Sequence, residues 1–145
     1  MMIARTLVLA LAASGALALA TQAGAETLRY TATLDGAHET PPNDSHGHGM
    51  ADVTYDTETH AISWNVTFDG LTGPATMAHI HGPAPVGKAA GVVVPLGMAP
   101  KSPTSGQATL TDVQANDLKQ GLLYVNVHTA AHPAGEIRGQ LTPAP

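Results

Sequence analysis

The sequence predicts an all-β protein, an antiparallel β-sandwich or Greek-key barrel of the superoxide dismutase-like type with one short helix. Residues 62–68 alternate strictly between apolar and polar side chains, which is typical of a half-buried strand. Several other short segments alternate in the same way and are separated by turns rich in Gly and Pro. Many short strands at regular spacing favour a sandwich or a partly closed barrel.

The expected strands follow one another along the chain with surface connections between them. Leu28 and Tyr30 begin the apolar face of the first strand, and Trp64 lies at the centre of the clearest one. The strands are expected at residues 27–34, 51–55, 62–68, 77–81, 91–96, 106–111, 122–128 and 136–142. Buried positions are predicted at Trp64, Val66, Ile80, Val125 and Val127. The segments 41–49, 82–90 and 98–105 have the composition of loops.

One helix is expected at Asp112 to Gln120. Thr111 and Gln114 form a T-x-x-Q pattern that resembles a capping box, and Gly121 supplies a natural stop. The helix therefore lies between two predicted strands.

The N-terminus, residues 1–25, has the features of a secretory signal peptide. Arg5 precedes an apolar run from Leu7 to Ala20, and Ala23-Gly24-Ala25 offers a cleavage site. The run is short for a membrane span, which needs about 20 residues. We expect a periplasmic or secreted product, residues 26–145, with a single domain and no membrane insertion after cleavage.

Composition excludes several classes of partner and scaffold. The chain has 6 basic and 11 acidic residues, a net charge of −5, and no basic run, which argues against nucleic-acid binding. It contains no cysteine, so it is not a disulfide scaffold. No Ser-His-Asp arrangement, phosphate loop or close carboxylate pair supports hydrolase or transferase chemistry.

Histidines at two predicted strands are the strongest indication of function. His79 and His81 share one strand face, because side chains alternate along a strand. His128 lies opposite the apolar face formed by Val125 and Val127. If the two strands are neighbours, the three imidazoles converge with nitrogen separations of roughly 3–5 Å, as ligands of one ion require. Three imidazoles without a thiolate suit Cu(II), with zinc as a less distinctive alternative.

Other residues near this pattern are weaker candidates. His132 follows His128 by four residues in a predicted loop, where it either joins the site as a fourth ligand or is solvated. Met77 shares the face of His79 and is either a soft ligand or a packing residue. His46 and His48, in a Gly-rich stretch, are candidates for a second, looser metal contact whose role the sequence leaves open.

Several sequence motifs in order resemble the CHRD domain family, which is named for modules in chordin. They begin with Leu34-Asp35-Gly36-Ala37-His38-Glu39-Thr40-Pro41-Pro42 and continue with Ala78-His79-Ile80-His81-Gly82. The last are Tyr124-Val125-Asn126-Val127-His128-Thr129 and Gly135-Glu136-Ile137-Arg138-Gly139. The resemblance implies an exported domain and covers nearly all of residues 26–145. A family label does not define an activity, and we interpret Glu39, Glu136 and Arg138 as structural.

A second resemblance is to Cu/Zn superoxide dismutase, also a β-sandwich. That enzyme has an H-x-H pair and a later V-H pair among its copper ligands, similar to His79-Ile80-His81 and Val127-His128. The chain departs from the enzyme in three respects. No histidine between His81 and His128 can bridge two metals, there is no cysteine pair, and Arg138 has a different spacing to the next glycine.

Three functions follow from these observations. The leading interpretation is an exported CHRD protein that binds a metal ion, copper before zinc, through a surface cluster of histidines, for storage, delivery or tolerance. One alternative is a copper enzyme resembling superoxide dismutase, although we expect the protein not to be an enzyme. The other is an extracytoplasmic interaction module whose protein partner the sequence does not identify.

Overall fold

The structure is a computed structural model that describes residues 24–145. Nearly all of the expected signal peptide, residues 1–25, lies outside the described residues. The strands are β1 (Thr27–Asp35), β2 (His48–Asp56), β3 (Ala61–Asp69), β4 (Ala75–His81), β5 (Val92–Met98), β6 (Thr104–Thr109), β7 (Tyr124–Thr129), β8 (Ile137–Gln140) and β9 (Thr142–Pro143). A 3-10 turn, η1 (Gly36–His38), follows β1, and the helix α1 (Asp112–Lys119) precedes β7.

Alternation of apolar and polar residues produces the strands and the core. Along β3, Ile62, Trp64 and Val66 are buried while the residues between them are exposed. Ile80 on β4, with Val125 and Val127 on β7, completes the set of core residues expected from the sequence, and all of them are buried. Burial of such side chains stabilises the fold by about 1.5–3 kcal/mol each.

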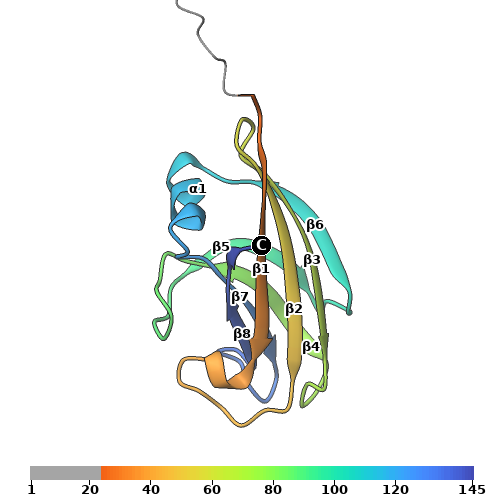
Figure 1. Cartoon of the computed structure of the whole chain (residues 1–145). Helices are drawn as coiled ribbons and strands as arrows, with labels where there is room; N and C mark the ends of the chain where they lie inside the picture. The colour runs from red at the N-terminus through yellow and green to blue at the C-terminus, as the bar shows by residue number, and fades with distance from the viewer. Residues whose placement is uncertain (1–23) are drawn as a thin grey trace, which may run out of the picture.

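All strands belong to one antiparallel sheet, in which the order β5-β4-β7-β8-β1-β2-β3-β6 is nearly closed on itself. Figure 1 shows these strands curling around a common interior. The two ends of the order approach each other, since the Thr104 hydroxyl of β6 donates to the Leu96 carbonyl of β5 at 3.4 Å. The predicted all-β antiparallel class is confirmed, as a single curled sheet intermediate between a barrel and a sandwich.

The predicted helix is present with both halves of its capping box. The Thr111 hydroxyl accepts from the Gln114 N–H at 3.3 Å, and the Gln114 side chain accepts from the Thr111 N–H at 2.9 Å. Gly121 follows with a φ of 71°, the left-handed conformation that ends many helices. Buried Ala115 and Leu118 attach the helix to the core.

Most predicted strand bounds differ from the observed ones by one or two residues, and the two largest differences arise from strand pairing. β2 begins at His48 rather than at residue 51, because His48 already pairs with Asp35 and Asp69 on the flanking strands. The expected last strand divides into β8 and β9 at Leu141, whose N–H donates to the Leu123 carbonyl at 3.0 Å. No helix within residues 24–145 has the length and apolar character needed to cross a membrane.

Candidate metal centre

The site is built on β4 and β7, which are adjacent antiparallel strands. Their register places Met77 opposite His128, His79 opposite Asn126 and His81 opposite Tyr124. Residues directly opposite each other point to the same face of a sheet. The three histidines therefore share the outer face, while the intervening aliphatic residues point into the core.

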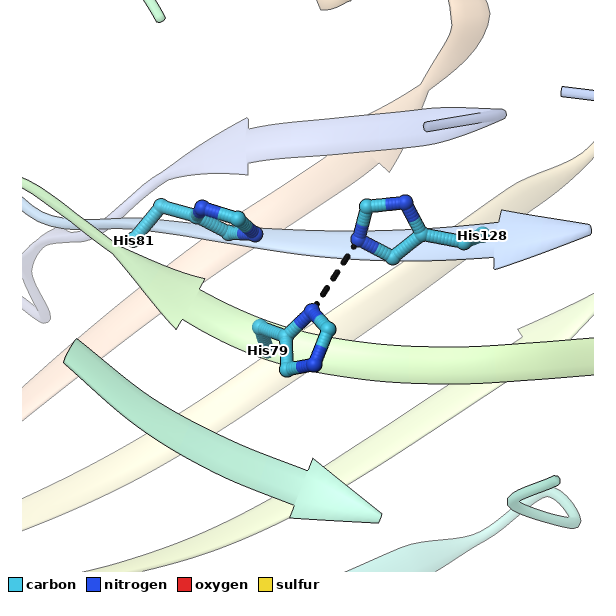
Figure 2. Close-up of side chains that lie close together, drawn as sticks. All are labelled: His79, His81 and His128. Atoms are coloured by element: carbon cyan, nitrogen blue, oxygen red, sulfur yellow. Dashed lines mark hydrogen bonds between the residues drawn. The ribbon is translucent and has the colours of Figure 1, made fainter. Parts of the chain in front are cut away.

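The imidazoles converge, as the strand pattern predicts. One ring nitrogen from each of His79, His81 and His128 lies within 4.8 Å of the others. The ring centroids are separated by 5.1 to 5.8 Å. His79 Nδ1 and His128 Nε2 are 3.1 Å apart, and Figure 2 shows all three rings gathered around one point. Two nitrogens that each bind an ion at about 2 Å are themselves about 3 Å apart, so this spacing fits a shared ion.

Backbone carbonyls orient two of the three rings. His128 Nδ1 donates to the Pro133 carbonyl at 3.0 Å, and His81 Nδ1 donates to the Ala90 carbonyl at 3.0 Å. The proton of each neutral ring is then on Nδ1, which leaves the lone pair on Nε2. Metal-binding histidines are commonly held in this way by a hydrogen bond from the second ring nitrogen.

His81 Nε2 is buried and has no hydrogen-bond partner among the described residues. An unsatisfied buried polar atom costs about 1–3 kcal/mol, and such atoms in a folded protein call for an explanation. Because the other nitrogen of the ring is already bonded, this lone pair is free to bind a cation.

Burial also controls the charge of the cluster. It lowers the pKa of His79, His81 and His128 below the ordinary value of 6.5, and the proximity of His128 and His81 lowers that of His79 further. The rings are therefore neutral at neutral pH, and the neutral ring is the form that binds metals.

The outer face beside the histidines is covered by loops. The Tyr124 ring stacks on the His81 ring with centroids 5.2 Å apart, and its hydroxyl accepts from the Ala90 N–H at 3.0 Å. On its other side, the Arg138 guanidinium lies 3.5 Å from the Tyr124 ring centroid. Arg138 also donates to the Pro85 carbonyl at 3.4 Å. The segment between β4 and β5 is thus attached over the site.

A second loop contributes a buried polar network next to His79. The carboxylate of Glu39 accepts hydrogen bonds from the Asn126 amide and from the Thr40 N–H, and Arg138 donates to the Thr40 hydroxyl at 3.0 Å. Burial raises the pKa of Glu39 to about 7, although these hydrogen bonds and the nearby Arg138 oppose the rise. The expected structural role of Glu39 and Arg138 agrees with these contacts.

Glu136 anchors the turn that follows His128. It is fully buried, and its carboxylate accepts from the Ser45 hydroxyl at 2.6 Å, the Thr129 hydroxyl at 2.5 Å, and the Thr72 hydroxyl and N–H at 2.8 Å each. Burial acts to raise the pKa of Glu136, but these hydrogen bonds outweigh it and lower the pKa. Three segments distant in sequence are joined here. From the sequence alone, only the Gly135-Glu136-Ile137-Arg138-Gly139 pattern indicated that Glu136 mattered.

The weaker candidates are not part of the convergent group, which consists of His79, His81 and His128. His132 does not join the group of convergent ring nitrogens; it lies in the turn after β7, where its N–H donates to the Thr129 carbonyl at 3.2 Å. His46 lies in the loop before β2, and His48 Nδ1 contacts the His46 carbonyl at 3.3 Å. Met77 borders the cluster, since it is directly opposite His128 on the neighbouring strand.

The structure corrects the expectation that the histidines lie at the surface. His128 is only 5% exposed, and His79 and His81 are half-buried. The outer face is nearly as buried as the core face along β7, because loops pack over it. Strand alternation identifies the two faces, but it does not show that a face is covered.

Comparison with known proteins identifies a family and no individual relative. The model of the family described as CHRD domain matches residues 30–141. The chain therefore belongs to this family, whose domain is of an extracellular type. No curated protein and no solved structure matches the chain.

Proposed function

We propose that this CHRD-domain protein binds a copper ion through His79, His81 and His128 and acts outside the cytoplasm in metal storage, delivery or tolerance. The observation that carries the proposal is the buried, unpartnered Nε2 of His81, which lies beside the paired nitrogens of His79 and His128. A purely structural histidine would have used both of its ring nitrogens or exposed one to water.

The donor set favours copper. Imidazole nitrogens bind Cu(II) more tightly than the other common divalent metals of its row, in keeping with the Irving–Williams order. Zinc also accepts three imidazoles, and it is the second candidate ion. An exported protein meets copper more readily than a cytoplasmic one does, which agrees with the extracellular type of the domain.

Nδ1 of His79, the third nitrogen of the cluster, becomes available to a metal ion by a change of tautomer. Since His128 Nδ1 donates to Pro133, its Nε2 accepts, and the hydrogen bond of 3.1 Å requires the proton on His79 Nδ1. Transfer of that proton to His79 Nε2 frees the Nδ1 lone pair. Three neutral rings then offer three lone pairs without a change in net charge.

Titration of the metal-free protein with Cu(II), followed by visible absorption and EPR, tests the proposal. We expect a spectrum of bound Cu(II) with nitrogen hyperfine structure, and affinity reduced more than about tenfold in each of His79→Ala, His81→Ala and His128→Ala. The double variant His46→Ala/His48→Ala is the matched control, and its affinity stays near that of wild type. If the control variant loses as much Cu(II) affinity as the three single variants do, the proposal is contradicted.

The same preparation tests the enzyme alternative. We expect little or no superoxide dismutation by the copper-loaded protein, because it lacks the bridging histidine of the enzyme it resembles. Rapid dismutation that disappears in His128→Ala would establish the enzyme interpretation in its place.

A further inference from the structure

Two methionines form a cross-strand pair at the edge of the histidine cluster. Met77 on β4 is directly opposite Met98 on β5, so both side chains point to the same face. The Ala99 N–H donates to the Thr76 carbonyl at 2.8 Å, which makes Met77 and Met98 a non-hydrogen-bonded pair. In such pairs the Cα atoms are only about 4.5 Å apart and the side chains are closest.

This pair continues a row that ends at the metal centre. Met77 has Met98 on one side and His128 on the other, and His79 is two residues further along β4. Residues at this spacing on a strand are about 6.6 Å apart. Met98 is 78% exposed, Met77 is half-buried and His128 is 5% exposed. The row therefore leads from solvent to the buried nitrogens.

Packing does not account for the exposed member of the pair. Met98 leaves most of a large apolar side chain in water, and the neighbouring exposed positions of β5 are Val92 and Pro95, which are not ligands. A thioether is a soft donor that selects Cu(I), and the flexible methionine side chain adapts to the position of an ion. Thioethers are not protonated at accessible pH, so protons do not compete for them.

We propose that Met77 and Met98 form a thioether subsite that takes up a soft monovalent cation, Cu(I) above all, and passes it to His128 and His79. Met98 is the first donor that an incoming ion meets, and Met77 is shared between the thioether pair and the histidines. The ion exchanges one ligand at a time, without a change in oxidation state. Delivery to the histidines rests on the proposed function, whereas uptake by the methionines does not.

Methyl NMR of the protein labelled with ¹³C at the methionine Cε tests uptake, with Ag(I) as a redox-inert substitute for Cu(I). We expect the Met77 and Met98 methyl resonances to shift together on addition of Ag(I). Met50, which is 52% exposed on β2 and away from the site, should not shift. Ag(I) affinity should fall at least about tenfold in Met77→Leu and in Met98→Leu, and stay unchanged in Met50→Leu.

The outcomes separate this inference from the proposed function. Ag(I) that shifts Met50 as strongly as Met77 and Met98, or affinity that is unchanged in both Leu variants, overturns the thioether subsite. Cu(II) affinity in the two Leu variants is expected to stay within about threefold of wild type, because the nitrogen donors are intact. A wild-type protein that binds no Cu(II), yet shows Ag(I) shifts at Met77 and Met98, overturns delivery to the histidines and leaves the subsite supported.

Discussion

Replacement of His81 by Phe separates a metal-binding role from a structural one. The change keeps a ring of similar shape against Tyr124 and removes both ring nitrogens. Loss of the unpartnered Nε2 removes a cost of about 1–3 kcal/mol. Loss of the Nδ1 hydrogen bond to the Ala90 carbonyl removes about 0.5–1.5 kcal/mol of stabilisation. That carbonyl still accepts from the Tyr124 hydroxyl at 3.4 Å.

We therefore expect metal-free His81→Phe to be within about 1 kcal/mol of wild type in free energy of unfolding, or more stable. Urea unfolding in the presence of a chelator measures the difference. With Cu(II) at 100 times its dissociation constant, the wild type should gain about 2.7 kcal/mol, and His81→Phe should gain much less. A metal-free variant that is more than about 2 kcal/mol less stable than wild type would contradict a metal-binding role for His81, because the imidazole would then stabilise the fold itself.

Two buried carboxylates provide further tests, with opposite dependence on pH. Glu136→Gln should lower the free energy of unfolding at pH 7 by about 2–4 kcal/mol, because an amide cannot accept from the Thr72 N–H and all three hydroxyl donors as the carboxylate does. The lowered folded-state pKa of Glu136 makes its ionised form stabilising above the unfolded value of 4.5, and this contribution is lost as pH falls through the folded-state pKa. Urea unfolding between pH 7 and 3 checks it, and a stability difference between wild type and variant that does not narrow on acidification contradicts the assignment. Glu39 has its pKa raised from 4.5 to about 7, so its stability contribution is present below pH 4.5 and lost as pH rises through about 7. At about 1.4 kcal/mol per pKa unit, the free energy of unfolding of Glu39→Gln relative to wild type should rise by up to about 3 kcal/mol between pH 4 and pH 8. If this difference between variant and wild type is the same at both pH values, the pKa of the Glu39 carboxyl is not raised in the folded protein.

Much of the local structure is readable from the sequence because its causes are local. Alternation at residues 62–68 places Trp64 in the core whatever the strand pairs with. The capping box of Thr111 and Gln114 starts the helix from within four residues. The shared face of His79 and His81 likewise follows from their spacing alone.

Contacts between distant segments decided the rest of the site. The register that sets Met77 opposite His128 and Met98 depends on how β4 pairs with β7 and β5, and no local pattern encodes it. The burial of His128, and of Glu39 against Asn126, depends on loops that fold back over the sheet.

The all-β class, the helix, the core positions and the orientation of the three histidines away from the core could all be predicted from the sequence. Each depends on the backbone period or on neighbours along the chain. Three features became visible only in the folded chain: loops cover the histidine face, the carbonyls of Ala90 and Pro133 accept from Nδ1 of two of the rings, and His132 lies outside the cluster. These features arise from loop packing, in which the energy of burying polar groups is balanced by partners far away in sequence.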